Sequence, residues 1–241
     1  MKVIEEVSFM KKPGLDPKEE NKFLKRLYRQ DYQKLFLIFT EGTRTEPAYF
    51  EGFKRAAETI SPSKALIEIV GVGQAAVKLL DYAKDFIEKY EVRDAEVWLV
   101  TDKDDFPDDQ FNELVRQCAR RDKQKYLNNY WHCAWSNECF ELWFILHFSF
   151  YQAAATRTEY FRMLKEKYRQ LGLETYAKND RNSFEIMTKY GNPKNAVKWA
   201  RKLYEEKAGL LPLRAIPCTT VYQLVLGLAR YLPDELKQKY F

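Results

Sequence analysis

Acidic side chains follow two short apolar runs of this sequence, and their spacing suits metal-dependent chemistry on a phosphate. The run at residues 35–39 leads to Glu41, and the run at residues 97–100 leads to Asp102 and Asp104. Two residues apart on an extended chain, Asp102 and Asp104 share one face, and close carboxylates repel unless a cation lies between them. Such hard oxygen ligands suit Mg²⁺ or Mn²⁺. Glu41 could then bind a second ion or act as a general acid or base.

Acidic residues just after strands have a second interpretation, because they often cap the helix that follows. Asp105, which precedes Phe106 and Pro107, fits that role, and so does Asp108. An isolated Asp-x-Asp pair leaves both interpretations open. The Glu-Gly pair that follows the earlier apolar run favours the metal site.

The elements that would position these acids are predicted by the hydrophobic pattern. Short apolar runs, typical of strands buried on both faces of a parallel sheet, occur at residues 35–39, 65–70, 97–100 and 130–135. Helical apolar spacing alternates with them, at residues 48–59, 74–90, 108–124 and 137–148. This alternation predicts an α/β fold with a Rossmann-type, mainly parallel central sheet. In such a fold, ligands bind outside the carboxyl ends of the strands.

Three regions are predicted along the chain. Residues 1–31 are charged and are typical of an N-terminal arm or a peripheral helix, and residues 32–151 form the α/β core. Strands are expected to stop beyond about residue 152. We therefore predict that residues 152–241 form a helical C-terminal part packed on the core, with helices at residues 157–171, 182–190, 194–207 and 219–231.

Composition excludes several classes of protein. The chain has 241 residues, 46% of them hydrophobic and 15% aromatic, which is enough apolar surface for a sizeable core. With 40 Lys and Arg against 35 Asp and Glu, the net charge of +5 permits an anionic partner without demanding one. Residues 1–6 lack the apolar core of a signal peptide, and the apolar stretch at 140–151 is too short to span a membrane. We expect a cytoplasmic protein that has no membrane segment.

Three blocks of the sequence resemble the RloB-like family. The pattern E-G-x-x-T-E-P-x-Y-F begins at Glu41, and the pattern N-x-x-F-E-L-W-x-x-L-H-F begins at Asn137. Between them lies Val-Trp-Leu-Val-Thr-Asp102-Lys-Asp104, and a weaker match begins at Pro217. These blocks occur in the family's order from residue 35 to residue 226.

The resemblance implies a Toprim-type core, the compact α/β unit of topoisomerases, primases and some nucleases. Its signature is a Glu after the first strand and an Asp-x-Asp after a later one, which would make Glu41, Asp102 and Asp104 the catalytic and metal-binding residues. RloB-like proteins are regarded as bacterial anti-phage proteins linked to abortive infection or restriction. Many are encoded beside an ABC-type or AAA-like ATPase, which would be the natural partner.

We therefore expect a Mg²⁺- or Mn²⁺-dependent nuclease of an abortive-infection system that cleaves DNA or RNA under the control of an ATPase, with homo-oligomer formation left open. Two other functions stay open as well. One is a non-catalytic defence subunit whose acidic cluster docks onto its ATPase. The other is nucleotidyl transfer, as in primases.

Glu141 is a further candidate, since it would be costly to bury unpaired within the apolar residues 140–148. Either it binds the metal beside Asp102, or it pairs with a base such as Arg44. His147, about 240° around the same predicted helix from Glu141, is interpreted as a core histidine.

Basic residues near the acids are candidates for contact with nucleic acid. Arg44 and Lys103, which adjoin the acids in sequence, are predicted to touch the scissile phosphate. A second group lies on or just after the predicted helix at 108–124 and includes Arg120 and Arg121 as candidate contacts. Such clusters can release counterions from a polyanion, although a solvated helix face is their usual role.

Overall fold

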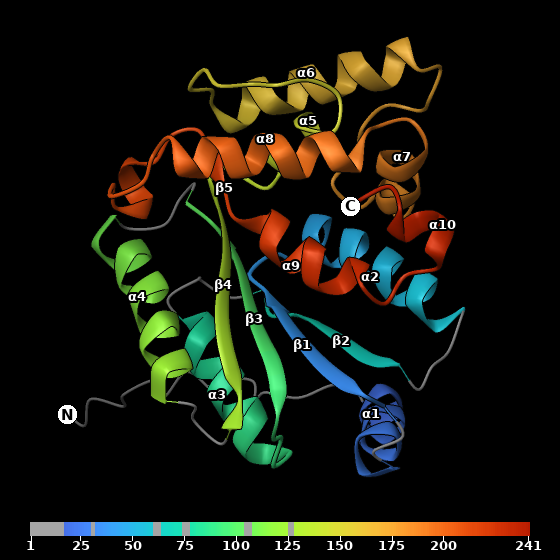
Figure 1. Ribbon diagram of the computed structural model, residues 1–241, viewed down its shortest axis with the longest axis vertical. Helices are drawn as coiled ribbons and strands as arrows, with labels where there is room; N and C mark the ends of the chain where they lie inside the picture. The colour runs from blue at the N-terminus through green and yellow to red at the C-terminus, as the bar shows by residue number, and fades with distance from the viewer. Residues whose placement is uncertain (1–16, 30–31, 60–63, 74–77, 104–107, 125–127) are drawn as a thin grey trace, which may run out of the picture.

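A five-stranded sheet with helices on both faces forms the framework of the protein (Figure 1). The computed structural model describes residues 17–29, 32–59, 64–73, 78–103, 108–124 and 128–241. The strands are β1 Lys34–Thr40, β2 Ala65–Gly71, β3 Ala95–Asp102, β4 Tyr130–Asn137 and β5 Cys218–Thr219. Their order in the sheet is β2-β1-β3-β4-β5, with β1 to β4 parallel and β5 antiparallel to β4. The predicted α/β fold with a mainly parallel sheet is confirmed.

Each central strand is apolar on both faces, and alternate residues enter two separate cores. In β1, Phe36 and Ile38 belong to one core, whereas Leu35, Leu37 and Phe39 belong to the other. This alternation follows from the two-residue period of a strand. It explains why the run at 35–39 is continuously apolar, because neither face of the strand meets water.

Different parts of the chain cover the two faces. One face is covered by α1 Pro17–Arg29, α3 Leu79–Lys89 and α4 Asp108–Gln124. The other is covered by α2 Thr45–Glu58 and by helices that follow β4. These are α5 Glu141–Ile145, α6 Arg157–Gln170, α7 Ser183–Lys189, α8 Pro193–Glu205, α9 Val221–Ala229 and α10 Asp234–Lys237, with a 3-10 turn at Pro212–Arg214 before β5.

The helix α1 packs against the sheet through its apolar side chains. Phe23 and Leu27 are buried, and the Phe23 ring lies 5.7 Å from the Phe86 ring of α3. Arg26 also forms an ion pair of 2.6 Å with Glu58 at the end of α2. The sequence predicted either an arm or a peripheral helix for residues 1–31. The described part of this region, residues 17–29, is a helix packed on the core.

Two predictions about the later part of the chain are wrong. Strands do not stop near residue 152, because β5 returns to the sheet edge, where Thr220 N donates to Trp135 O at 2.9 Å. Two residues are too few to display a strand's period, so only the pairing with β4 reveals them. The helix expected at 137–148 is also shorter, since Asn137 still belongs to β4 and α5 spans Glu141–Ile145.

The carboxyl ends of the parallel strands meet at one edge of the sheet. In Figure 1, α6 and α8 lie at that end of the molecule and α1 lies at the opposite end. The carboxyl ends of β1, β3 and β4 therefore lie together at the end of the sheet where α6 and α8 lie.

Within the described ranges, none of the helices has the length and apolar character that a membrane crossing requires. The boundaries proposed from the sequence at residues 31/32 and 151/152 stay a prediction.

A matched pair of helical glycines tests the packing of the core. A Cβ atom at Gly52 of α2 would collide with the Phe184 side chain of α7, whereas a Cβ at Gly227 of α9 would lie 3.6 Å from Phe36. We expect Gly52→Ala to lower the free energy of unfolding by about 1–3 kcal/mol through overpacking. Gly227→Ala should raise it by about 0.5–1 kcal/mol, because alanine favours helices. Denaturant unfolding of both variants measures the difference, and equal effects would contradict the α2–α7 packing.

Candidate active site

A cavity of about 400 Å³ at the carboxyl ends of the strands gathers four carboxylates. Glu41 and Asp102 come from the ends of β1 and β3, Glu46 lies in the first turn of α2, and Glu141 begins α5. The structure thus brings together three of the four acids predicted from the sequence, and Asp104 lies outside the described residues. The rest of the wall consists of Gly42, Thr43, Arg44, Thr45, Gly73, Phe140, Arg157 and Lys178.

Glu41 is held by the strands on both sides of β1. Its backbone N–H donates to Val100 O at 3.0 Å, and its carbonyl accepts from Gly73 N at 3.1 Å. The Thr101 hydroxyl donates to Glu41 Oε2 at 2.8 Å. The central place of β1 in the sheet therefore positions this carboxylate at the cavity.

Asp102 is a carboxylate whose pKa the cavity shifts strongly. Burial raises its pKa well above the ordinary value, the nearby Glu46 and Glu141 raise it further, and a backbone hydrogen bond from Phe140 lowers it. Its Oδ1 atom is buried, and no described group donates a hydrogen bond to it. The end of β3 is anchored just beyond it, where Lys103 N donates to Ser136 O at 2.8 Å. Asp102 thus presents a buried oxygen that lacks a partner.

Glu46 is a buried acid of the site that the sequence analysis did not select. Burial raises its pKa to about 7, Glu141 and Glu41 raise it as well, and Lys178 lowers it. A Cβ atom at Gly42 would lie 2.5 Å from Glu46 Oε2. A side chain at position 42 would therefore displace the Glu46 carboxylate from its present place beside the Gly42 backbone.

Glu141 has a hydrogen-bond partner that differs from the one considered in the sequence. It is only 2% exposed, and the Tyr176 hydroxyl donates to its Oε1 at 2.9 Å. Tyr176 is itself buried and lies between α6 and α7. The structure therefore supplies a neutral donor, the Tyr176 hydroxyl, to Glu141 in place of a base.

Three cationic side chains also line the cavity. Arg44 was predicted, whereas Arg157 at the start of α6 and Lys178 before α7 were not. Both lie more than a hundred residues from Glu41 in the chain, and no motif connects them to it. Glu46 did carry a signal, since it belongs to the E-G-x-x-T-E-P pattern, but an acid in a helix's first turn is equally typical of a cap.

Other residues selected from the sequence lie away from the cavity. Arg120 and Arg121 are on α4, which covers the face of the sheet opposite to α2. The Arg121 guanidinium lies 5.3 Å from the Trp131 ring. Lys103 is not among the residues that line the cavity. Contact of Arg120, Arg121 and Lys103 with nucleic acid stays a prediction. His147 is buried, its Nδ1 lies 2.9 Å from Trp143 O, and burial lowers its pKa to about 4, as befits a core histidine.

The donor chemistry of the cavity fits a hard divalent cation. Carboxylate oxygens are the ligands that Mg²⁺ and Mn²⁺ prefer, and the buried Asp102 Oδ1 lacks a partner that a cation would supply. In the described part of the chain, however, no three His, Cys, Asp or Glu side chains already form a group that could hold a metal ion. Side chains would thus have to close around an ion. The sequence's further candidate ligand, Asp104, lies outside the described residues.

Without a cation, protons reduce the repulsion among these acids. Glu46, with its pKa near 7, changes charge close to neutral pH. A group of that kind can both give and accept a proton under physiological conditions. The site therefore combines hard oxygen donors with a proton-exchanging acid.

Comparison with known proteins connects this site to one family. The family model described as RloB-like protein matches residues 36–228, a range that contains all four carboxylates and the Arg157 and Lys178 positions. No curated protein matches the chain, and no solved structure matches it.

The raised pKa of Glu46 predicts a pH-dependent contribution to stability. Because its folded-state pKa is about 7, the folded chain keeps the Glu46 proton between about pH 4.5 and 7, where the unfolded chain has released it. Glu46 should therefore lower the free energy of unfolding as pH rises through that window in chelator, whereas His147, whose pKa burial lowers to about 4, acts in the opposite direction. The comparison of Glu46→Gln with wild type isolates the Glu46 contribution, which should be up to about 3 kcal/mol.

Denaturant unfolding at a series of pH values in EDTA measures this effect. The exposed Glu205 on α8 provides the matched control, and Glu205→Gln should leave the pH profile unchanged. A Glu46→Gln profile that coincides with wild type would contradict the raised pKa of Glu46.

Proposed function

The chain belongs to the RloB-like family, and from that premise we propose that it is a Mg²⁺- or Mn²⁺-dependent nuclease effector of bacterial anti-phage defence. We further propose that its core is of the Toprim type. In support of this assignment, Glu41 follows β1 and Asp102 ends β3, and both line one cavity.

One observation carries the proposal: the buried Asp102 Oδ1 has no described hydrogen-bond partner and shares its cavity with three other carboxylates. Burying acids together is costly, because desolvation and mutual repulsion both disfavour their charged forms. A divalent cation would offset both the cost of desolvation and the repulsion between the carboxylates. The arrangement is therefore better suited to ion binding than to stabilising the fold.

The four acids divide naturally into two roles. Glu41, Asp102 and Glu141 would hold the cation, together with Asp104. When bound, that cation would activate a water molecule and offset charge that develops on the phosphate. Glu46, whose pKa lies near 7, is suited to take up or release the proton of the attacking or leaving group.

The basic wall of the cavity is suited to the phosphate itself. Arg44, Arg157 and Lys178 line it opposite a set of negative charges. Positioned cations stabilise the transition state of phosphoryl chemistry most strongly where water is excluded. These cations would recognise the phosphate group, which DNA and RNA share. The basic wall is therefore suited to phosphodiesters in general and does not distinguish DNA from RNA.

Burial also weighs against a purely docking role for the acidic cluster. Glu46 and Glu141 are only 7% and 2% exposed, and Asp102 Oδ1 is buried. A partner protein would need acids on the surface. We place the partner ATPase, which the family resemblance implies, in a regulatory role, and we propose that the nuclease acts in the cytoplasm.

Substitution of the acids tests the activity. We expect Glu41→Gln and Asp102→Asn each to lower cleavage of DNA or RNA by about a hundredfold or more. Cleavage in Mg²⁺ or Mn²⁺ is measured with the purified chain alone and with its neighbouring ATPase, and toxicity is measured during phage challenge. Glu205→Gln should behave as wild type, and circular dichroism should show that all variants are folded.

The same variants separate the competing functions. Full toxicity and cleavage from a folded Glu41→Gln, Asp102→Asn double variant would overturn the nuclease proposal. Calorimetry that detects no Mg²⁺ or Mn²⁺ binding, with the ATPase complex intact, would favour the docking subunit. Incorporation of labelled nucleotides would favour nucleotidyl transfer.

A further inference from the structure

A second cavity, of about 430 Å³, adjoins the acidic one and has the opposite character. Thr43 and Arg44 belong to the walls of both cavities, so the two meet where α2 begins. The remaining wall comes from α2 and from the segment before α7, and it consists of Pro47, Ala48, Glu51, Arg55, Asn179 and Arg181.

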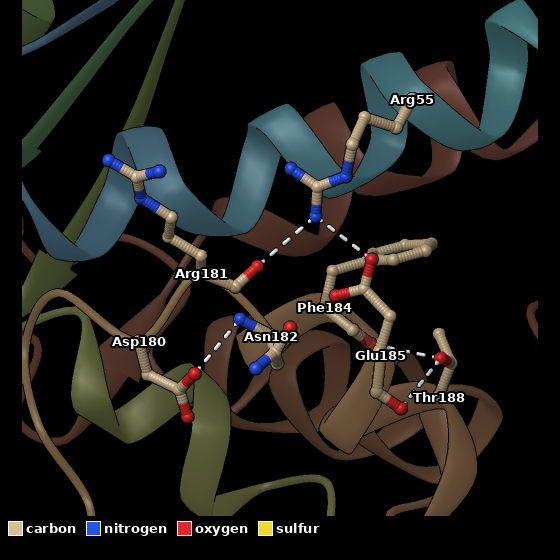
Figure 2. Close-up of polar contacts among 7 residues, drawn as sticks. All are labelled: Arg55, Asp180, Arg181, Asn182, Phe184, Glu185 and Thr188. Carbon is tan, nitrogen blue, oxygen red and sulfur yellow. Dashed lines mark hydrogen bonds and ion pairs between the residues drawn. The ribbon is translucent and has the colours of Figure 1, made fainter.

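The Arg55 side chain joins the two sides of this second cavity. Its Nη2 donates to the backbone carbonyl of Arg181 at 3.1 Å and forms an ion pair of 2.9 Å with Glu185 Oε1 (Figure 2). Asn182 N donates to Asp180 Oδ1 at 2.9 Å, which closes the turn before α7. The backbone at Arg181 is therefore tied to α2. Figure 2 shows the Arg181 guanidinium pointing away from Glu185 and toward α2.

The charges of the second cavity are not balanced by its own acids. Arg55 is paired with Glu185, and Glu51 lies 3.8 Å from Lys54. Among the described residues, no carboxylate forms an ion pair with the guanidinium of Arg44 or Arg181. Two guanidinium groups thus face a cavity that is suited to an anion, and the positive end of α2 lies beside them.

Guanidinium groups match phosphate particularly well, because their planar donors form paired hydrogen bonds to its oxygens. A single phosphate at the acidic cavity would leave the second cavity without a function. A nucleic-acid strand would occupy both cavities, because the phosphate next to the reacting one lies further along the same backbone.

We infer that the cavity of Arg44, Arg55 and Arg181 binds a backbone phosphate of the nucleic-acid strand, next to the phosphate that lies at the carboxylates. This inference rests on the proposed function and specifies the path of its substrate. The strand passes over Arg44 from one cavity into the other, and Arg181 holds the flanking phosphate. Arg55 is a positioning residue that keeps Arg181 against α2.

Binding and cleavage by Arg181 variants test this path. Fluorescence anisotropy with labelled DNA and RNA oligonucleotides, in EDTA and over a series of salt concentrations, measures binding without cleavage. Arg181→Gln should weaken binding by about tenfold and reduce the slope of log K against log salt by about 1. Arg181→Lys should recover part of the loss, because it keeps the charge without the planar donors.

Arg93 provides the matched control, because it is exposed and precedes β3 at the opposite end of the sheet. Arg93→Gln should leave both binding and its salt dependence unchanged. In cleavage, Arg181→Gln should raise KM and leave kcat close to wild type, since it removes binding that substrate and transition state share. Both side chains are exposed, so both variants should fold.

The outcomes separate this inference from the proposed function. If Arg181→Gln and Arg93→Gln bind and cleave alike while wild type cleaves, the flanking site is wrong and the nuclease stands. If wild type cleaves neither DNA nor RNA but Arg181→Gln loses binding, the strand path stands and the nuclease is wrong. Displacement of the oligonucleotide by polyglutamate at equal charge would overturn the preference for phosphate.

Discussion

The confinement of four carboxylates within one cavity is the constraint on which the rest of the site depends. Burial raises the pKa of Glu46 and of Asp102, and the nearby Glu41 and Glu141 raise both further. Such a cluster is stable only where neighbouring groups offset its charge. The hydroxyls of Thr101 and Tyr176 and the charge of Lys178 do part of this, and protons or a cation supply the rest.

The sheet makes this confinement possible because it holds the backbone of the acids rigidly. Glu41 is hydrogen-bonded on both sides of β1, and the chain beyond Asp102 is bonded to β4. Two apolar cores, one on each face, then prevent the strands from separating to relieve the repulsion. Rigidity in the scaffold thus preserves an unfavourable set of charges at its edge, which is the arrangement that a binding site for cations requires.

The C-terminal part supplies residues to both cavities as well as covering the sheet. Arg157 and Lys178 line the acidic cavity, Tyr176 donates to Glu141 there, and Arg181 lines the second cavity. The helix α2 contributes residues to the walls of both cavities and is tied to the later chain by Arg55. Acidic and basic surfaces are therefore joined through a single helix, although their residues are far apart in sequence.

The sequence by itself determined the alternation of strands and helices, because buried parallel strands and amphipathic helices have distinct local periods. It also predicted that Glu41 and Asp102 would lie together, since the carboxyl ends of parallel strands share one edge, and it left open whether Glu141 would join them or pair with a base. Only the tertiary structure showed that Glu46 joins the acids of the cavity, where burial and the neighbouring Glu141 and Glu41 raise its pKa. It alone brought Arg157, Lys178 and Arg181 to the cavities, because these residues arrive through contacts between distant parts of the chain, and such contacts leave no local pattern in a sequence.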